Sequence, residues 1–141
     1  MLLQSNYPIG NLIVGVYWLK IEYLNEKVEE LCTSVKAAKK LFGGDEELVE
    51  KLQSRIRAFS AADTLKDIIN QPSFHFHKLY KKGNRKLDGY FAVDLKSRKE
   101  SWRIIIQPLD SDEKPYDPCN IDEIAGFVRI IEISEVSKHY E

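Results

Sequence analysis

The chain has 141 residues, of which 43% are hydrophobic and 30% are charged, and its formal net charge is −1. These values are typical of one globular domain that buries a single core. They exclude a disulfide framework or a cysteine-based zinc site, because only Cys32 and Cys119 are present and they are far apart. Two unpaired thiols indicate a reducing cytoplasm.

The N-terminal region begins with a hydrophobic run at residues 11–19. This run is too short to cross a bilayer, which needs about 20 residues, and no basic segment precedes it. We therefore expect neither a targeting signal nor a membrane partner. Residues 19–24 alternate apolar and polar side chains, which predicts a half-buried strand. Residues 1–18 are interpreted as an N-terminal extension to a single domain at 19–141.

Helical patterns follow this strand. Apolar side chains recur every three or four residues, with a good N-cap residue before each run and Gly43-Gly44 between the runs. The predicted elements are a helix from Asn25 to about residue 42, a helix from Asp45 to Phe59 and a short helical turn at 65–69. A connection this short predicts that the first two helices form an antiparallel hairpin.

After Pro72 the pattern changes to the two-residue period of strands. Predicted strands cover residues 74–77, 90–95, 102–107 and 128–133. The order predicts an α+β domain with an N-terminal strand, a helical hairpin and then an antiparallel sheet of three to four strands. Helices should cover one face of this sheet and leave the other face free for a ligand.

The small net charge hides a strong asymmetry. Residues 78–103 hold nine basic and three acidic residues, a net charge of +6, whereas residues 104–141 hold three and nine, a net charge of −6. A basic block of this kind can steer a protein toward an anion. The alternative is a solvated hairpin with long cationic side chains.

The aromatic residues near this block favour RNA as the anion. Gly83-Asn84 should form a turn at the tip of the cationic segment, with Tyr90 and Trp102 behind it. Cations neutralise phosphates and aromatic rings stack on unpaired bases, a combination suited to single-stranded RNA. The cationic residues of this segment are Lys78, Lys81, Lys82, Arg85 and Lys86.

Two histidines precede the basic segment. On a strand, His75 and His77 share one face, opposite Phe74 and Phe76. If the phenylalanines face the core, the histidines face outward, where an imidazole can serve as a general acid or base. Two histidines can also bind a metal, but no carboxylate accompanies them at a ligand spacing in the sequence, and we expect no metal.

Arg103 is the one charged residue in the apolar strand at 102–107. Such an arginine either pairs with a buried carboxylate or presents its guanidinium to a phosphate. At the C-terminus, His139 and Tyr140 add an imidazole and a phenol. A disordered tail is the usual state of a terminus.

Several segments, in this order and spacing, resemble one protein family. They are Phe76–Leu79 with the basic loop, Gly89–Val93, Trp102–Ile104 and the ending Glu135–Glu141. Residues 19–141 resemble the RelE/HigB/ParE superfamily of type II toxins, and in particular its HigB-like "killer protein" branch. The resemblance implies a RelE-like fold.

The resemblance also implies a function. Such toxins are cytoplasmic endoribonucleases that cut mRNA, usually on the ribosome, without metal or cofactor, and a HigA-like helix-turn-helix antitoxin inactivates them. Attack by the 2′-hydroxyl on phosphorus needs a base, an acid and a cation. By position, the resemblance assigns His77 and His139 to acid and base and Arg103 to the transition-state charge. Tyr140 would stack on a base, and His75, Tyr90 and the five cations above would bind RNA.

The sequence departs from the family pattern at two places. The usual His-Pro-Leu-Lys-Gly reads His-Lys-Leu-Tyr-Lys-Lys-Gly at residues 77–83, and the usual terminal Asp-Tyr-His appears as His139-Tyr140. The alternatives are a ParE-like poison of DNA gyrase and a non-catalytic module that binds the antitoxin. The ribonuclease prediction requires His77 and Arg103 to converge on one exposed concave surface. An arginine held by an internal carboxylate would remove the case for strand scission.

Overall fold

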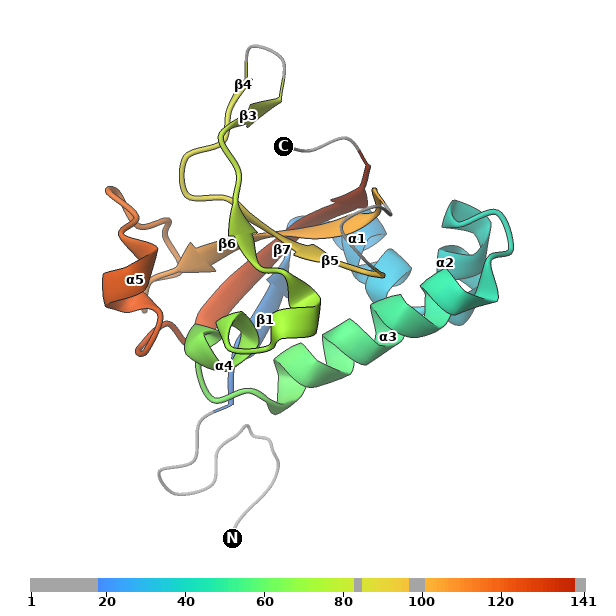
Figure 1. Cartoon of the computed structure of the whole chain (residues 1–141), viewed down its shortest axis with the longest axis horizontal. Coiled ribbons are helices and arrows are strands. Elements are labelled where there is room, and N and C mark those ends of the chain that lie inside the picture. The colour runs from blue at the N-terminus through green and yellow to red at the C-terminus, as the bar shows by residue number, and fades with distance from the viewer. Residues whose placement is uncertain (1–17, 83–84, 97–100, 139–141) are drawn as a thin grey trace, which may run out of the picture.

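The computed structural model describes residues 18–82, 85–96 and 101–138 (Figure 1). It confirms an α+β architecture built on a five-stranded sheet of order β1-β7-β6-β5-β2. The strands of this sheet are β1 Lys20–Tyr23, β2 His77–Lys78, β5 Phe91–Asp94, β6 Arg103–Leu109 and β7 Ile130–Ser137. The four later strands pair antiparallel as predicted, and β1 makes the sheet mixed because it runs parallel to β7. Hydrophobic alternation predicts strands but does not fix their direction.

The first predicted helix is two helices, α1 Glu26–Thr33 and α2 Val35–Leu41. Asn25 caps α1 as predicted, since its Oδ1 accepts from the N–H of Val28 at 2.9 Å. Ser34 then takes an extended conformation, and its Oγ accepts from the N–H of Ala37 at 3.2 Å. A serine that caps a new helix in this way ends the preceding one.

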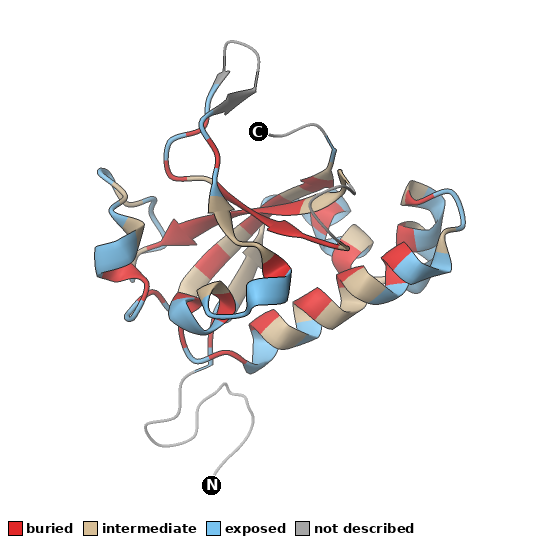
Figure 2. Ribbon diagram, viewed as in Figure 1, coloured by how far each residue is buried: buried red, intermediate tan, exposed pale blue. Residues whose placement is uncertain are grey.

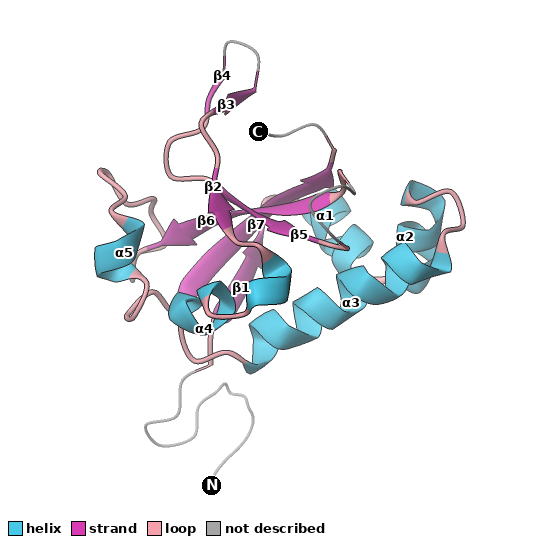
Figure 3. Cartoon of the chain, in the orientation of Figure 1, coloured by secondary structure: helices cyan, strands magenta, loops and turns pink. Residues whose placement is uncertain are grey.

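The other predicted helices are confirmed. Helix α3, Glu46–Ala61, begins after Asp45, whose carboxylate accepts from two backbone N–H groups. Helix α4 spans Leu65–Ile69, and the short α5, Ile121–Ile124, was not predicted. Helices α1 to α4 lie along one face of the sheet (Figures 1 and 3). Among the described residues, every helix is too short or too polar to span a membrane.

The main core lies between these helices and the sheet. Its fully buried members include Leu52 and Phe59 of α3, Ile104 and Ile106 of β6, and Ile133 of β7. Figure 2 shows buried residues recurring along α3 between exposed ones. This is the amphipathic pattern that the three- and four-residue spacing predicted.

The segment before β2 differs from the predicted strand at 74–77. Pro72–Phe74 form a 3₁₀ turn, and His75 has a left-handed backbone with φ of 46°. Proline fits the first position of such a turn because its φ is fixed near the helical value. Phe74 is nevertheless buried, and Phe76 stacks on Phe91 at 5.0 Å, so the phenylalanines face the core as predicted.

The face of the sheet opposite the helices is partly covered rather than free. Leu79 and Leu87 pack against Ala92 and Ile105 in a second, smaller cluster. Between these two leucines, β3 Lys81–Lys82 and β4 Arg85–Lys86 form a separate two-stranded hairpin. This hairpin projects away from the sheet (Figure 3). What remains of this face, which we call the open face, carries the candidate site.

Candidate functional site

The centre of the site is Asp94, a residue that the sequence did not single out. In the sheet register Asp94 lies directly opposite Arg103, and cross-strand partners share a face. Alternation along β5 places Asp94 on the open face with Ala92. The Asp94 side chain is completely buried. A buried carboxylate needs charged or hydrogen-bonded partners, and two side chains provide them.

His75 is the first partner. Its Nδ1 lies 2.8 Å from Oδ2 of Asp94. Because an ionised carboxylate only accepts hydrogen bonds, Nδ1 carries the proton and donates it, which leaves Nε2 as the acceptor in the neutral ring. The His75 side chain is 32% exposed, so the ring extends from the buried carboxylate to the surface.

His77 has the same tautomer for a different reason. Its Nδ1 lies 2.7 Å from the backbone oxygen of His75, which accepts the hydrogen bond, so Nε2 is again left as the acceptor. The two rings stack with centroids 4.6 Å apart and planes at 29°. Among the described residues, neither Nε2 has a hydrogen-bond partner. We call these two rings the histidine pair.

Arg103 is the second partner of Asp94. Its Nε lies 3.0 Å from Oδ1 of Asp94, an ion pair without hydrogen-bond alignment. Its Nη1 donates to the backbone oxygen of Ser101 at 2.9 Å, and only 14% of the side chain is exposed. Of the two alternatives that the sequence left open, the structure shows the pairing with a buried carboxylate.

His77 and Arg103 therefore lie on one face but do not meet directly. His77 pairs with Ala92 and Arg103 with Asp94, two residues further along β5. The link between them runs through His75 and Asp94. The two side chains share a face, but Arg103 is largely buried and held by an internal carboxylate, which removes the case for strand scission by His77 and Arg103 together.

A second arginine, Arg55 of α3, was also missed. Its Nε donates to the backbone oxygen of Asp94 at 3.1 Å and its Nη2 to that of Leu95 at 3.0 Å. Its guanidinium carbon lies 4.4 Å from the ring centroid of Phe74. Burial lowers the pKa of Arg55, and Asp94 opposes that shift. Arg55 thus holds the end of β5 and the residue before His75 in fixed positions.

The predicted RNA-binding residues do not all join this site. Lys78 pairs with Phe91, which faces the helices, so Lys78 points away from the open face, and its Nζ lies 5.6 Å from the ring of Tyr80. Lys86 is exposed, whereas Tyr90 packs against the smaller cluster. Predictions for other positions lie outside the described side chains: Lys81, Lys82, Arg85, His139 and Tyr140.

Acidic side chains share the open face. Glu135 lies opposite Ile105, and Glu132 lies opposite Gln107 and beside Glu22 of β1. Burial raises the pKa of Glu132, and Glu22 raises it further. The open face is therefore mixed in charge and not the uniformly basic surface that a bound polyanion would favour.

One ring nitrogen of each histidine and an oxygen of Asp94 lie within 4.8 Å of one another. The carboxylate that the sequence did not place near the histidines thus comes from β5. The sequence did contain a sign of this carboxylate. An aspartate within the apolar strand at residues 91–95 is rarely buried unless it is paired, so Asp94 could have been expected to need a partner.

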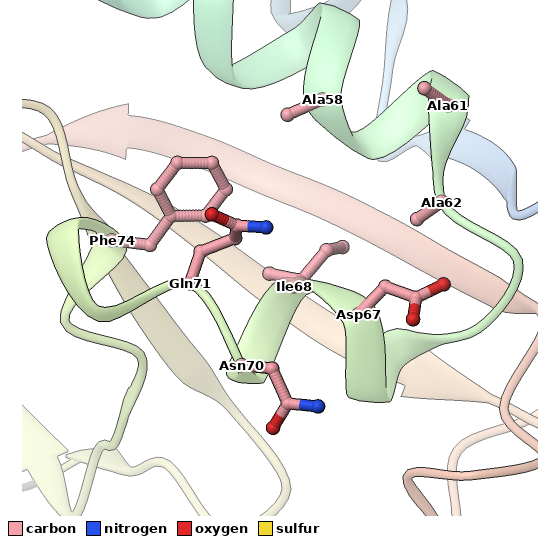
Figure 4. A pocket seen from close by; sticks show the side chains of 8 residues that line it. All are labelled: Ala58, Ala61, Ala62, Asp67, Ile68, Asn70, Gln71 and Phe74. Carbon is pink, nitrogen blue, oxygen red and sulfur yellow. The ribbon is translucent and has the colours of Figure 1, made fainter.

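A surface pocket of about 420 Å³ lies between the end of α3 and the α4 region (Figure 4). Alanines and Phe74 line it together with Asp67, Asn70 and Gln71, and no cation is among these residues. It therefore does not fit a phosphate, and we place the candidate site at the histidine pair.

No family model, curated protein or solved structure matches the chain.

Proposed function

We propose that the protein is a metal-independent endoribonuclease and that the histidine pair supplies its acid and base. The observation that supports this proposal is that His75 and His77 each commit Nδ1 to an acceptor, while neither Nε2 has a hydrogen-bond partner in the part of the chain that the structure describes. An imidazole fixed in this tautomer by a neighbouring acceptor is the usual arrangement of a catalytic histidine.

The roles follow from the two acceptors. A proton added to Nε2 of His75 leaves a positive ring beside the Asp94 carboxylate, whereas His77 has only a neutral carbonyl beside it. We therefore assign the general acid to His75 and the general base to His77. His77 takes the proton of the 2′-hydroxyl, and His75 donates one to the departing 5′-oxygen.

The stacking of the rings fits this reaction. In an in-line displacement the attacking and leaving oxygens lie on opposite sides of one phosphorus. Two imidazoles side by side, 4.6 Å apart, can each reach one of these oxygens. Arg103 enters this proposal as the residue that holds Asp94 and, through it, the ring of His75.

In the cell, this activity would be that of a type II toxin that cuts mRNA on the ribosome and is inactivated by a helix-turn-helix antitoxin. The support is the set of segments that resemble HigB-like toxins and the α+β order of strand, helices and sheet. Strands β3 and β4 are basic in sequence, and in this proposal their lysines and arginine would bind RNA phosphates.

The second candidate is a non-catalytic module of the same fold that binds the antitoxin. Two observations favour it: Asp94 already neutralises Arg103, and Glu135 shares the open face. In that case His75 serves only to satisfy the buried carboxylate.

Cleavage of single-stranded RNA in EDTA decides between these candidates, with and without translating ribosomes. We expect fragments that end in a 2′,3′-cyclic phosphate, and His77→Ala and His75→Ala should each reduce the rate by about 100-fold or more. The control is Lys66→Ala, an exposed residue of α4 outside the site. Intact RNA under both conditions, with normal growth during strong expression, would leave only the non-catalytic module.

A further inference from the structure

We propose that the histidine pair is also a binding site for a divalent transition-metal ion of the zinc class. The ion would bind Nε2 of His75 and Nε2 of His77. Metal binding does not depend on the proposed function. The effect on RNA cleavage rests on it, because an ion on both nitrogens would occupy the acid and the base together and so inhibit the reaction.

The hydrogen bonds around the rings carry this inference. A metal-binding histidine usually donates its other ring N–H to a carboxylate or a backbone carbonyl, which fixes the tautomer and the ring orientation. Both kinds of acceptor occur here, since His75 donates to the carboxylate of Asp94 and His77 donates to the backbone oxygen of His75. Each ring is thus oriented as a ligand would be, with its second nitrogen available.

The distances are close to those of a bound ion. Two nitrogens on one zinc ion at about 2.0–2.1 Å each are at most about 4.2 Å apart. One ring nitrogen of each histidine and an oxygen of Asp94 lie within 4.8 Å of one another, which brings the two rings close enough to share an ion. The rings stack with centroids 4.6 Å apart and planes at 29°. An ion on both Nε2 atoms would tilt the two rings slightly toward each other with their Nδ1 hydrogen bonds kept, which their partial exposure permits.

Asp94 acts in this site through His75 rather than as a direct ligand. It is completely buried, and its other oxygen is paired with Arg103. The same pairing offsets the positive charge of Arg103, which would otherwise repel a cation. Two protein ligands leave the remaining positions to water, so the ion should exchange. Imidazole ligands favour zinc, copper or nickel over magnesium or calcium.

Calorimetric titration of the EDTA-treated, dialysed full chain with zinc chloride tests the site. We expect one zinc ion per chain, and His75→Ala and His77→Ala should each weaken binding by at least about 10-fold. Lys66→Ala, at an exposed position of α4, is the control and should bind like the unaltered protein. Cys119→Ser controls for the half-buried thiol. Unaltered binding by either alanine variant of the pair, or no binding by the unaltered chain, would overturn the proposal.

Asp94→Asn tests whether the carboxylate that accepts the hydrogen bond of His75 contributes to metal binding. It keeps both imidazoles and removes the charge behind His75, so zinc affinity should fall by about 10- to 100-fold. Asp88→Asn, at an exposed position, should bind zinc normally. A melting curve of each variant confirms folding. Equal affinity in folded Asp94→Asn would overturn the role of the carboxylate. Zinc binding without any RNA cleavage in EDTA would reject the proposed function and leave the metal site standing.

Discussion

The two faces of the sheet differ in the side chains that they bury. On the face toward the helices, apolar side chains from four strands and five helices form one continuous core. On the open face, a small cluster of four buried residues lies beside a buried carboxylate, an arginine and two histidines. Neighbouring residues of β6 show the division, because Ile104 belongs to the main core and Ile105 to the small cluster.

This difference shows where the fold tolerates charge. Burying a carboxylate in a sheet lowers the stability of the fold unless the carboxylate has charged or hydrogen-bonding partners. Asp94 has one partner from β6, Arg103, and one from the turn before β2, His75. The site therefore lies where three segments meet at one end of β5. The helix-covered face has a single continuous apolar core and no comparable cluster among the described residues.

The largest expected effect comes from removing this charge. Asp94→Ala leaves Arg103 largely buried without its carboxylate and His75 without its acceptor. Breaking a buried ion pair by removing one partner typically costs about 3–5 kcal/mol. We expect a loss of this size in the free energy of unfolding, measured by urea denaturation. Asp88→Ala, which changes an exposed aspartate, is the control. Equal stability of the two variants would show that the pairing is not maintained in solution.

A matched pair in β6 compares the two faces directly. Ile104 and Ile105 are adjacent, equally buried and identical in chemistry, but they face opposite sides of the sheet. Ile104→Ala opens a cavity against packed helices and should cost about 3–4 kcal/mol, whereas the segment over Ile105 can relax into the space, and Ile105→Ala should cost about 2–3 kcal/mol. Thermal and urea unfolding of both variants give the order, and the reverse order would mean that the cover of the open face is the more rigid.

Local features of the fold could be predicted from the sequence. Asn25 and Asp45 cap helices as expected, because a cap depends on residues three or four positions away. The break at Ser34 was missed since the apolar stripe continues across it, with Val28 and Ala38 both buried in the main core. The parallel pairing of β1 with β7 was missed because it joins the two ends of the domain.

The site was less accessible to prediction. The isolated position of Arg103 in an apolar strand left a carboxylate and a phosphate open as partners, and the choice depends on the register between β5 and β6. His75 lies 19 residues before Asp94, and its left-handed backbone follows from the turn at Pro72 rather than from a strand. Side-chain alternation provides neither register nor turn geometry, so it could identify the histidines but not the carboxylate that joins His75 to Arg103.

The smallest expected effect concerns the acidic side of the open face and depends on pH. Burial, with a further contribution from Glu22, raises the pKa of Glu132 above its usual value of 4.5. In the folded state the carboxyl therefore holds its proton to higher pH than in the unfolded chain, so its contribution to stability is lost as pH rises through the folded pKa. Below about pH 4 both states are protonated and the carboxyl costs nothing.

Glu132→Gln should remove this penalty. The variant should melt at the same temperature as the unaltered protein near pH 4 and slightly higher at pH 7, by on the order of 1–2 °C. Glu50→Gln, at an exposed position of α3, should show no such dependence. Melting curves across this pH range measure the difference. A variant that is less stable at pH 7 would mean that the ionised Glu132 has a favourable partner, so that the open face would hold a second charge pair beside Asp94 and Arg103.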